Sequence, residues 1–148
     1  MSLEKQINDG IKAAMLAKEK VRLAALRAVK SEILLAKTAD GSETIADEAV
    51  LKIIGKLIKQ RKESAAVYTQ NDRPELAENE LAEAAELEVF MPRQLSAEEL
   101  EKALEAIIGE VGAKAPSDMG KVMGVATKRL AGQADGRTIS ETVKKLLQ

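Results

Sequence analysis

The apolar residues of this 148-residue chain recur three or four positions apart, and nowhere do they alternate with polar residues as in a half-buried β-strand. One segment shows the pattern clearly, with its apolar side chains on a single helical face: Leu26, Val29, Ile33 and Ala36. Because the chain has one tyrosine, one phenylalanine and no tryptophan, its core has to consist of aliphatic side chains. The sequence therefore predicts an all-α protein.

Turn and capping signals divide the chain into seven expected helices. Capping patterns open three of them: Thr44 with Asp47, Ser96 with Glu99, and Thr138 with Glu141. The expected helices cover about residues 3–17, 20–36, 44–68, 74–90, 96–111, 117–131 and 138–147. Met91 and Pro92 end the fourth helix. We therefore expect an N-terminal four-helix domain, residues 1–92, and a C-terminal three-helix domain, residues 94–148.

Missing residue types exclude several kinds of chemistry. The chain has no cysteine and no histidine, which removes disulfides, thiolate nucleophiles, imidazole bases and the usual zinc ligands. No phosphate-binding glycine loop and no activated serine is visible. We expect no catalytic residue, metal or cofactor, and interpret the chain as a binding module and not as an enzyme acting alone. With no membrane-spanning run and no secretory signal visible, the expected compartment is the cytoplasm.

Charge is distributed unevenly along the chain, although the net charge is only −1. Residues 1–37 carry eight basic and four acidic side chains, and residues 111–148 carry seven and three. In contrast, residues 73–110 carry three basic and eleven acidic side chains. Basic segments at both ends favour an anionic partner, although oppositely charged segments could instead neutralise one another.

Carboxylates and basic side chains occur together near the middle of the chain. Glu80 and Glu83 share one expected helical face, but a metal site of the bundle type would add histidines, which are absent. We expect these glutamates to form structural ion pairs with nearby basic residues, Arg61, Lys62 and Arg73. The run KQRKES, residues 59–64, is either a solvated helical face, a partner of those glutamates, or a contact for RNA.

The segment DMGKVMG, residues 118–124, holds two glycines inside an expected helix, each costing about 1 kcal/mol relative to alanine. On a helical wheel the apolar residues of this helix share one face: Met119, Val122, Met123, Ala126 and Leu130. The opposite face carries Gly120, Lys121, Gly124, Lys128 and Gly132. This glycine–lysine strip predicts either close contact with an RNA backbone or the docking of another helix. Three further basic residues extend the expected RNA-binding surface: Arg137, Lys144 and Lys145.

Several segments appear in the order typical of the YqeY family: KQRKES, DRPELAENE, MPRQLS, DMGKVMG and LAGQADGRTISETVKKLL. The chain resembles that family over nearly its whole length, and its tail is similar to the C-terminal domain of the GatB subunit of tRNA-dependent amidotransferase. The resemblance implies a helical domain followed by a three-helix tail that contacts the elbow of tRNA. It also implies carbon–nitrogen ligase activity with glutamine as amido-N-donor. Because no GatB-type catalytic domain or glutaminase nucleophile is visible, we assign that activity to the larger subunit.

Three functions are therefore compared. We expect a protein that binds tRNA or another structured RNA, acting with an amidotransferase or an aminoacyl-tRNA synthetase. The alternatives are a protein–protein adaptor, whose glycine strip docks a partner helix, and a glutamine-dependent ligase subunit.

Overall fold

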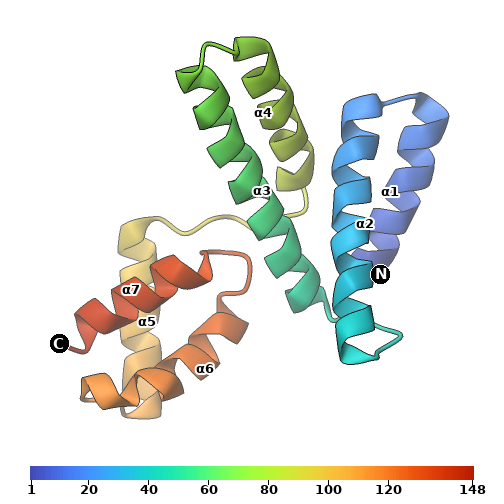
Figure 1. Cartoon of the computed structure of the whole chain (residues 1–148). Helices are drawn as coiled ribbons and strands as arrows, with labels where there is room; N and C mark the ends of the chain where they lie inside the picture. The colour runs from blue at the N-terminus through green and yellow to red at the C-terminus, as the bar shows by residue number, and fades with distance from the viewer. The chain divides into compact units, whose positions relative to one another are not determined.

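The computed structural model describes all residues, 1–148, and is entirely helical, which confirms the predicted all-α class (Figure 1). It contains seven α-helices and one 3-10 turn: α1 (Leu3–Ala17), α2 (Lys20–Asp40), α3 (Asp47–Gln70), α4 (Pro74–Glu88), α5 (Ala97–Val111), η1 (Pro116–Asp118), α6 (Met119–Arg129) and α7 (Gly136–Leu146). The chain forms two compact units, Met1–Met91 and Pro92–Gln148. None of the helices combines the length and apolar character needed to cross a bilayer.

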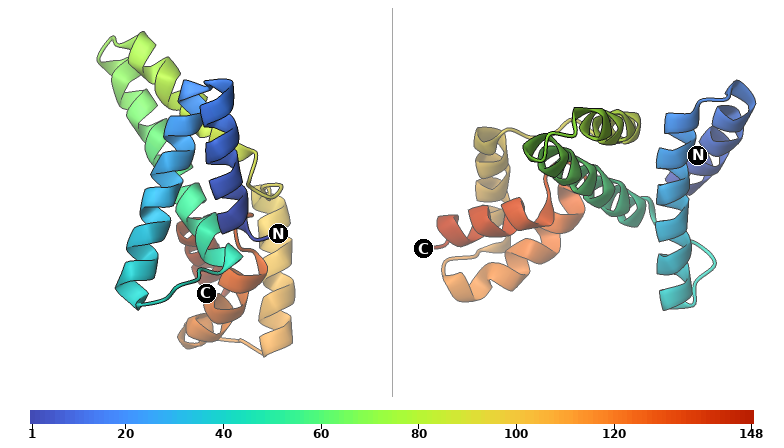
Figure 2. Two further views of the ribbon diagram at one scale, coloured as in Figure 1. Left: turned by 90° about the vertical axis from the view of Figure 1, so that its right-hand side faces the viewer. Right: turned by 45° about the horizontal axis from the view of Figure 1, so that its top comes forward.

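The first unit consists of two helical hairpins. α1 lies beside α2, α3 lies along α4, and α2 also contacts both helices of the second hairpin (Figure 2). The core between them is aliphatic, as the composition requires: Ile7, Ala25, Leu26, Val29, Ile33, Val50, Ile54, Leu57 and Leu87 are all buried. Phe90 and Met91 are partly buried against this core. An ion pair between Lys37 and Glu4 joins α2 to α1.

The start of α3 is capped differently from the prediction. Thr44 does not cap it: the N-cap position is Ala46, whose side chain has no acceptor. The Asp47 carboxylate accepts a hydrogen bond from the Leu3 backbone N–H at 2.9 Å, across 44 positions of sequence. Asp47 therefore satisfies one of the free amides at the start of α1 and ties the two hairpins together, a contact that local sequence patterns do not contain.

In the second unit, α5, α6 and α7 all contact one another. Its core is again aliphatic: Leu100, Leu104, Ile107, Val122, Ala126, Leu130, Ile139, Val143 and Leu147 are buried. α5 begins with the predicted capping box, in which the Ser96 hydroxyl accepts from the Glu99 N–H and the Glu99 carboxylate accepts from the Ser96 N–H. Gly112 ends α5 in the left-handed conformation, at a φ of 69°. This unit therefore follows its local start and stop signals closely.

The last two helices differ from the prediction in their limits. α6 ends at Arg129, earlier than expected, and a turn leads to Gly132 at a φ of +76°. α7 begins at Gly136, and its cap is Asp135, whose carboxylate accepts from the Thr138 N–H at 2.8 Å. The expected Thr138 cap is therefore wrong: the helix starts earlier, at Gly136, and Thr138 is already in its first turn, where its own N–H is capped by Asp135.

Candidate nucleic-acid interface

The loop before α6 is held by one carboxylate. Asp118 accepts hydrogen bonds from the backbone N–H groups of Lys114, at 3.0 Å, and Ala115, at 3.3 Å. These bonds hold the pKa of Asp118 below its ordinary value, with a smaller contribution from the Lys121 charge. The carboxylate thus binds the loop that precedes α6, and it fixes the position at which the glycine–lysine strip begins.

Gly120 and Gly124 lie on the exposed face of α6, opposite the buried Val122 and Ala126. A Cβ added at either glycine would have no heavy atom of a neighbouring group within 4 Å, and neither glycine has a positive φ. Neither packing nor backbone conformation within the chain therefore requires a glycine at these positions. The helical wheel placed both residues correctly, away from the core.

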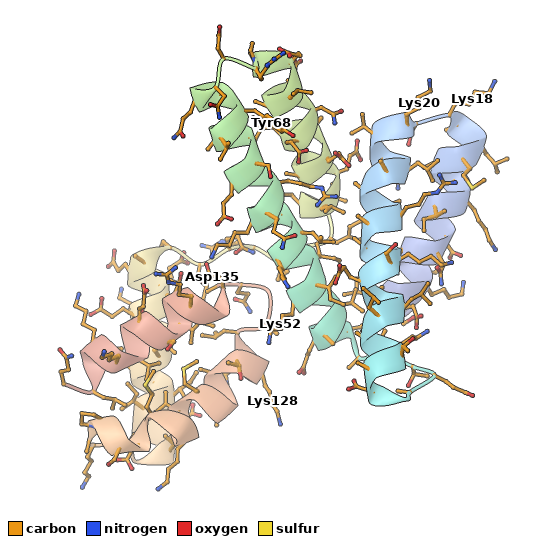
Figure 3. The ribbon with its side chains drawn as sticks, viewed as in Figure 1. Lys18, Lys20, Lys52, Tyr68, Lys128 and Asp135 are labelled. Atoms are coloured by element: carbon orange, nitrogen blue, oxygen red, sulfur yellow. The ribbon has the colours of Figure 1, made fainter.

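The lysines of the strip form no ion pair, although the charge of Lys121 acts on the nearby Asp118 carboxylate. Lys121 and Lys128 are exposed, and neither forms an ion pair. Figure 3 shows Lys128 extending outward from the C-terminal part of α6. Arg129 is different, because it pairs with Glu110 of α5 at 2.8 Å. α6 thus presents a backbone surface without side-chain cover, together with two unpaired ammonium groups.

Two other predicted RNA-binding residues have structural roles as well. Gly132 occupies a left-handed turn after α6, a conformation that favours glycine, and its carbonyl accepts from the Gln94 side-chain amide at 2.6 Å. Arg137 is exposed but pairs with Glu141 one turn later, at 3.1 Å. The conformation of the turn therefore explains Gly132, and the charge of Arg137 is partly neutralised.

The final two predicted residues, Lys144 and Lys145, lie in the last turn of α7 and are exposed without ion pairs. α7 packs on α6 and runs back in the opposite direction (Figures 1 and 2). The C-terminal end of α7 therefore lies toward the N-terminal end of α6. Unpaired lysines occur on both helices of this part of the unit, which makes the local surface basic.

The ion pairs predicted in the first unit form only in part. Arg61 of α3 lies 3.9 Å from the Glu83 carboxylate of α4, and both side chains are largely buried. Arg73 and Glu80 have no ionic partner within the chain. Arg73 lies in the turn before α4, and Glu80 is about two helical turns further on. Instead Lys62 pairs with Glu88, at 2.8 Å.

Comparison with known proteins places the chain in a family. The family described as "Yqey-like protein" matches residues 4–147. The chain belongs to this YqeY-like family. The predicted resemblance is thereby confirmed over nearly the whole chain.

Two relatives of the family carry the same name, "Altered inheritance of mitochondria protein 41, mitochondrial". The protein of Kluyveromyces lactis is 31% identical over 141 residues, which cover 93% of this chain and 72% of the relative. The protein of Clavispora lusitaniae is 30% identical over 105 residues, which cover 70% of this chain and 61% of the relative. The chain therefore spans less than two thirds of the second relative.

The predicted cytoplasmic location is contradicted by these relatives, both of which are named as mitochondrial proteins. The prediction rested on the absence of a secretory signal and of a membrane-spanning run. Neither feature distinguishes the cytoplasm from the interior of an organelle, so the inference had no physical basis for choosing between them.

Proposed function

We propose that this YqeY-like protein binds structured RNA through the glycine–lysine strip of α6. The single observation that supports the proposal is the exposure of Gly120 and Gly124 next to two lysines without ion pairs, Lys121 and Lys128, with open space where side chains would be. Each glycine lowers helix stability by about 1 kcal/mol relative to alanine, and nothing within the chain offsets that cost. A partner that approaches the backbone closely would account for it.

The chemistry of the strip suits a phosphodiester backbone. Phosphates need donors and cations near them, and a surface without Cβ atoms lets them approach the helix more closely than an alanine surface would. Lys121 and Lys128 supply the cations, and Lys144 and Lys145 of α7 extend the basic surface. The resemblance of the tail to the C-terminal domain of GatB makes tRNA our first choice of RNA, with an amidotransferase or synthetase as the protein that would use it.

A titration of total tRNA against the full chain at several salt concentrations tests the proposal. Phosphate contacts predict a linear decrease of log affinity with log salt, with a slope of roughly −0.7 to −0.9 per phosphate contacted. The variant Lys121→Gln with Lys128→Gln should bind more weakly and show a slope smaller in magnitude by about 1.4 to 1.8. The matched control is Lys102→Gln, because Lys102 is an exposed lysine of α5 in the same unit.

The titration also separates RNA binding from the alternative of helix docking. A partner helix packed on the two glycines would depend on close contact and only weakly on salt. Tight RNA binding that is unchanged in the Lys121→Gln, Lys128→Gln variant would place the RNA elsewhere. No detectable RNA binding at low salt would overturn the proposal.

A further inference from the structure

The turn between α1 and α2 exposes apolar side chains that the core does not use. Leu16 is 86% exposed, more than any other large apolar side chain of the chain, and Met15 beside it is 53% exposed. The buried face of α1 is formed instead by Ile7, Gly10 and Ala14. Leu16 and Met15 therefore lie at the free end of the hairpin, outside the core of the unit.

Unpaired lysines surround these two side chains. Lys12, one turn before Leu16, is exposed, as are Lys18 in the turn and Lys20 at the start of α2. None of the three forms an ion pair, and the one carboxylate of the turn, Glu19, is engaged by Arg22 at 3.3 Å. Lys18 and Lys20 extend away from the hairpin at its tip (Figure 3).

The conformation of the tip is fixed by the backbone. Lys18 adopts the left-handed conformation at a φ of 58°, and its N–H bonds back to carbonyls of the last turn of α1. The Glu19 N–H also donates to the Ala14 carbonyl, at 2.9 Å. The apolar pair and the lysines are therefore presented together on a well-defined turn.

We propose that this tip, residues 12–20, binds the surface of a membrane that contains anionic lipids. Leu16 and Met15 enter the boundary between headgroups and acyl chains, while Lys12, Lys18 and Lys20 contact the lipid phosphates. An apolar patch with surrounding cations binds such a membrane favourably, because the membrane offers both an apolar interior for the patch and negative charge for the cations. RNA offers the same charge but no comparable apolar volume for an isolated leucine. The proposal is independent of the function proposed for α6.

Cosedimentation of the full chain with phosphatidylcholine vesicles, with and without phosphatidylserine, tests this proposal. We expect binding to the anionic vesicles alone, and a decrease of about tenfold or more for Met15→Gln with Leu16→Gln. Lys18→Gln with Lys20→Gln should weaken binding by about fivefold per lysine. The matched control is Leu81→Gln, since Leu81 is a 50% exposed leucine on the acidic helix α4.

Each result either supports or contradicts the proposal. All four substituted side chains are exposed, and glutamine is a good helix former, so the variants should keep the helical circular dichroism of the parent. Failure of the parent to bind anionic vesicles overturns the proposal. Equal binding of the parent and the Met15→Gln, Leu16→Gln variant does so too. If the parent does not bind vesicles and Lys18→Gln with Lys20→Gln lowers the affinity for tRNA, the tip is an RNA contact instead.

Discussion

At the scale of single residues, the glycines of the second unit differ in why a glycine occupies the position, and the sequence alone does not distinguish the reasons. Gly112 and Gly132 adopt positive φ, where side chains are strained, whereas Gly120 and Gly124 have ordinary helical backbone and open space around the missing Cβ. The wheel predicted the exposure of the α6 pair, because helical spacing alone decides which face a residue occupies. It could not predict the φ of Gly132, which depends on where α6 ends.

This difference gives a stability prediction with an internal control. Gly120→Ala and Gly124→Ala should each raise the free energy of unfolding of the second unit by up to about 1 kcal/mol, through helix propensity. Gly112→Ala should lower it by about 1 kcal/mol, although its Cβ also meets open space, because alanine is strained at a φ of 69°. Hydrogen exchange of the amides of α5–α7 in the full chain measures the effect on this unit. A loss of protection in Gly120→Ala would mean that the strip is packed against something.

Replacing the two strip glycines by glutamine separates stability from binding. Gly120→Gln with Gly124→Gln should still stabilise α6, since glutamine is a better helix former than glycine. The same pair should weaken tRNA binding, because its side chains hold phosphates away from the backbone. A variant that is more stable and binds as well as the parent would show that the strip is not the RNA site.

At the scale of helices, the sequence predicts ends well where the cap is local and poorly where it is not. Ser96 and Glu99 formed the predicted box because both partners belong to one turn. α2 continues four residues beyond Ala36, to Asp40, because Gly41 ends it in the left-handed conformation. The bond from Leu3 to Asp47 was invisible to pattern analysis, since it depends on how two hairpins pack.

The capping box of α5 gives a prediction for pH. The Glu99 pKa is lowered from 4.5 to about 2, first by its hydrogen bond with Arg93 and then by its bonds with Ser96. A lowered pKa in the folded state stabilises the fold fully above the unfolded value, and this contribution is lost as the pH falls toward 2. Glu99→Gln should therefore lower the melting temperature at pH 7, and its difference from the parent should shrink between about pH 4.5 and pH 2.

The control for this experiment is Glu105→Gln, since Glu105 is an exposed glutamate of the same helix without a partner. That variant should melt close to the parent at every pH. A difference in melting temperature between Glu99→Gln and the parent that stays constant down to pH 2 would contradict the prediction. It would show that the charge of Glu99 does not contribute to the stability of the capping box.

At the scale of the whole molecule, the structure shows which residues of the unevenly charged sequence form ion pairs and which do not. Five glutamates from the acidic middle segment pair with basic residues: Glu83 with Arg61, Glu88 with Lys62, Glu98 with Lys102, Glu99 with Arg93, and Glu110 with Arg129. Of these basic residues only Arg129 belongs to one of the two basic ends, so the acidic middle segment neutralises little of their charge. The lysines that remain unpaired include those of the α1–α2 tip in the first unit and those of α6 and α7 in the second. Composition could show the excess of charge but not which lysines stay unpaired.

Two unpaired basic surfaces on two separate units predict that their functions can be removed separately. In the full chain, Lys121→Gln with Lys128→Gln should weaken tRNA binding and leave binding to anionic vesicles unchanged. Met15→Gln with Leu16→Gln should weaken binding to anionic vesicles and leave tRNA binding unchanged, because it removes apolar area and no charge. Both variants have the same number of substituted side chains, all at least half exposed or on an exposed helical face, so neither should change the melting temperature by much. If either variant lost both activities, the two surfaces would be serving one partner, and the separate proposals for α6 and for the hairpin tip would be wrong.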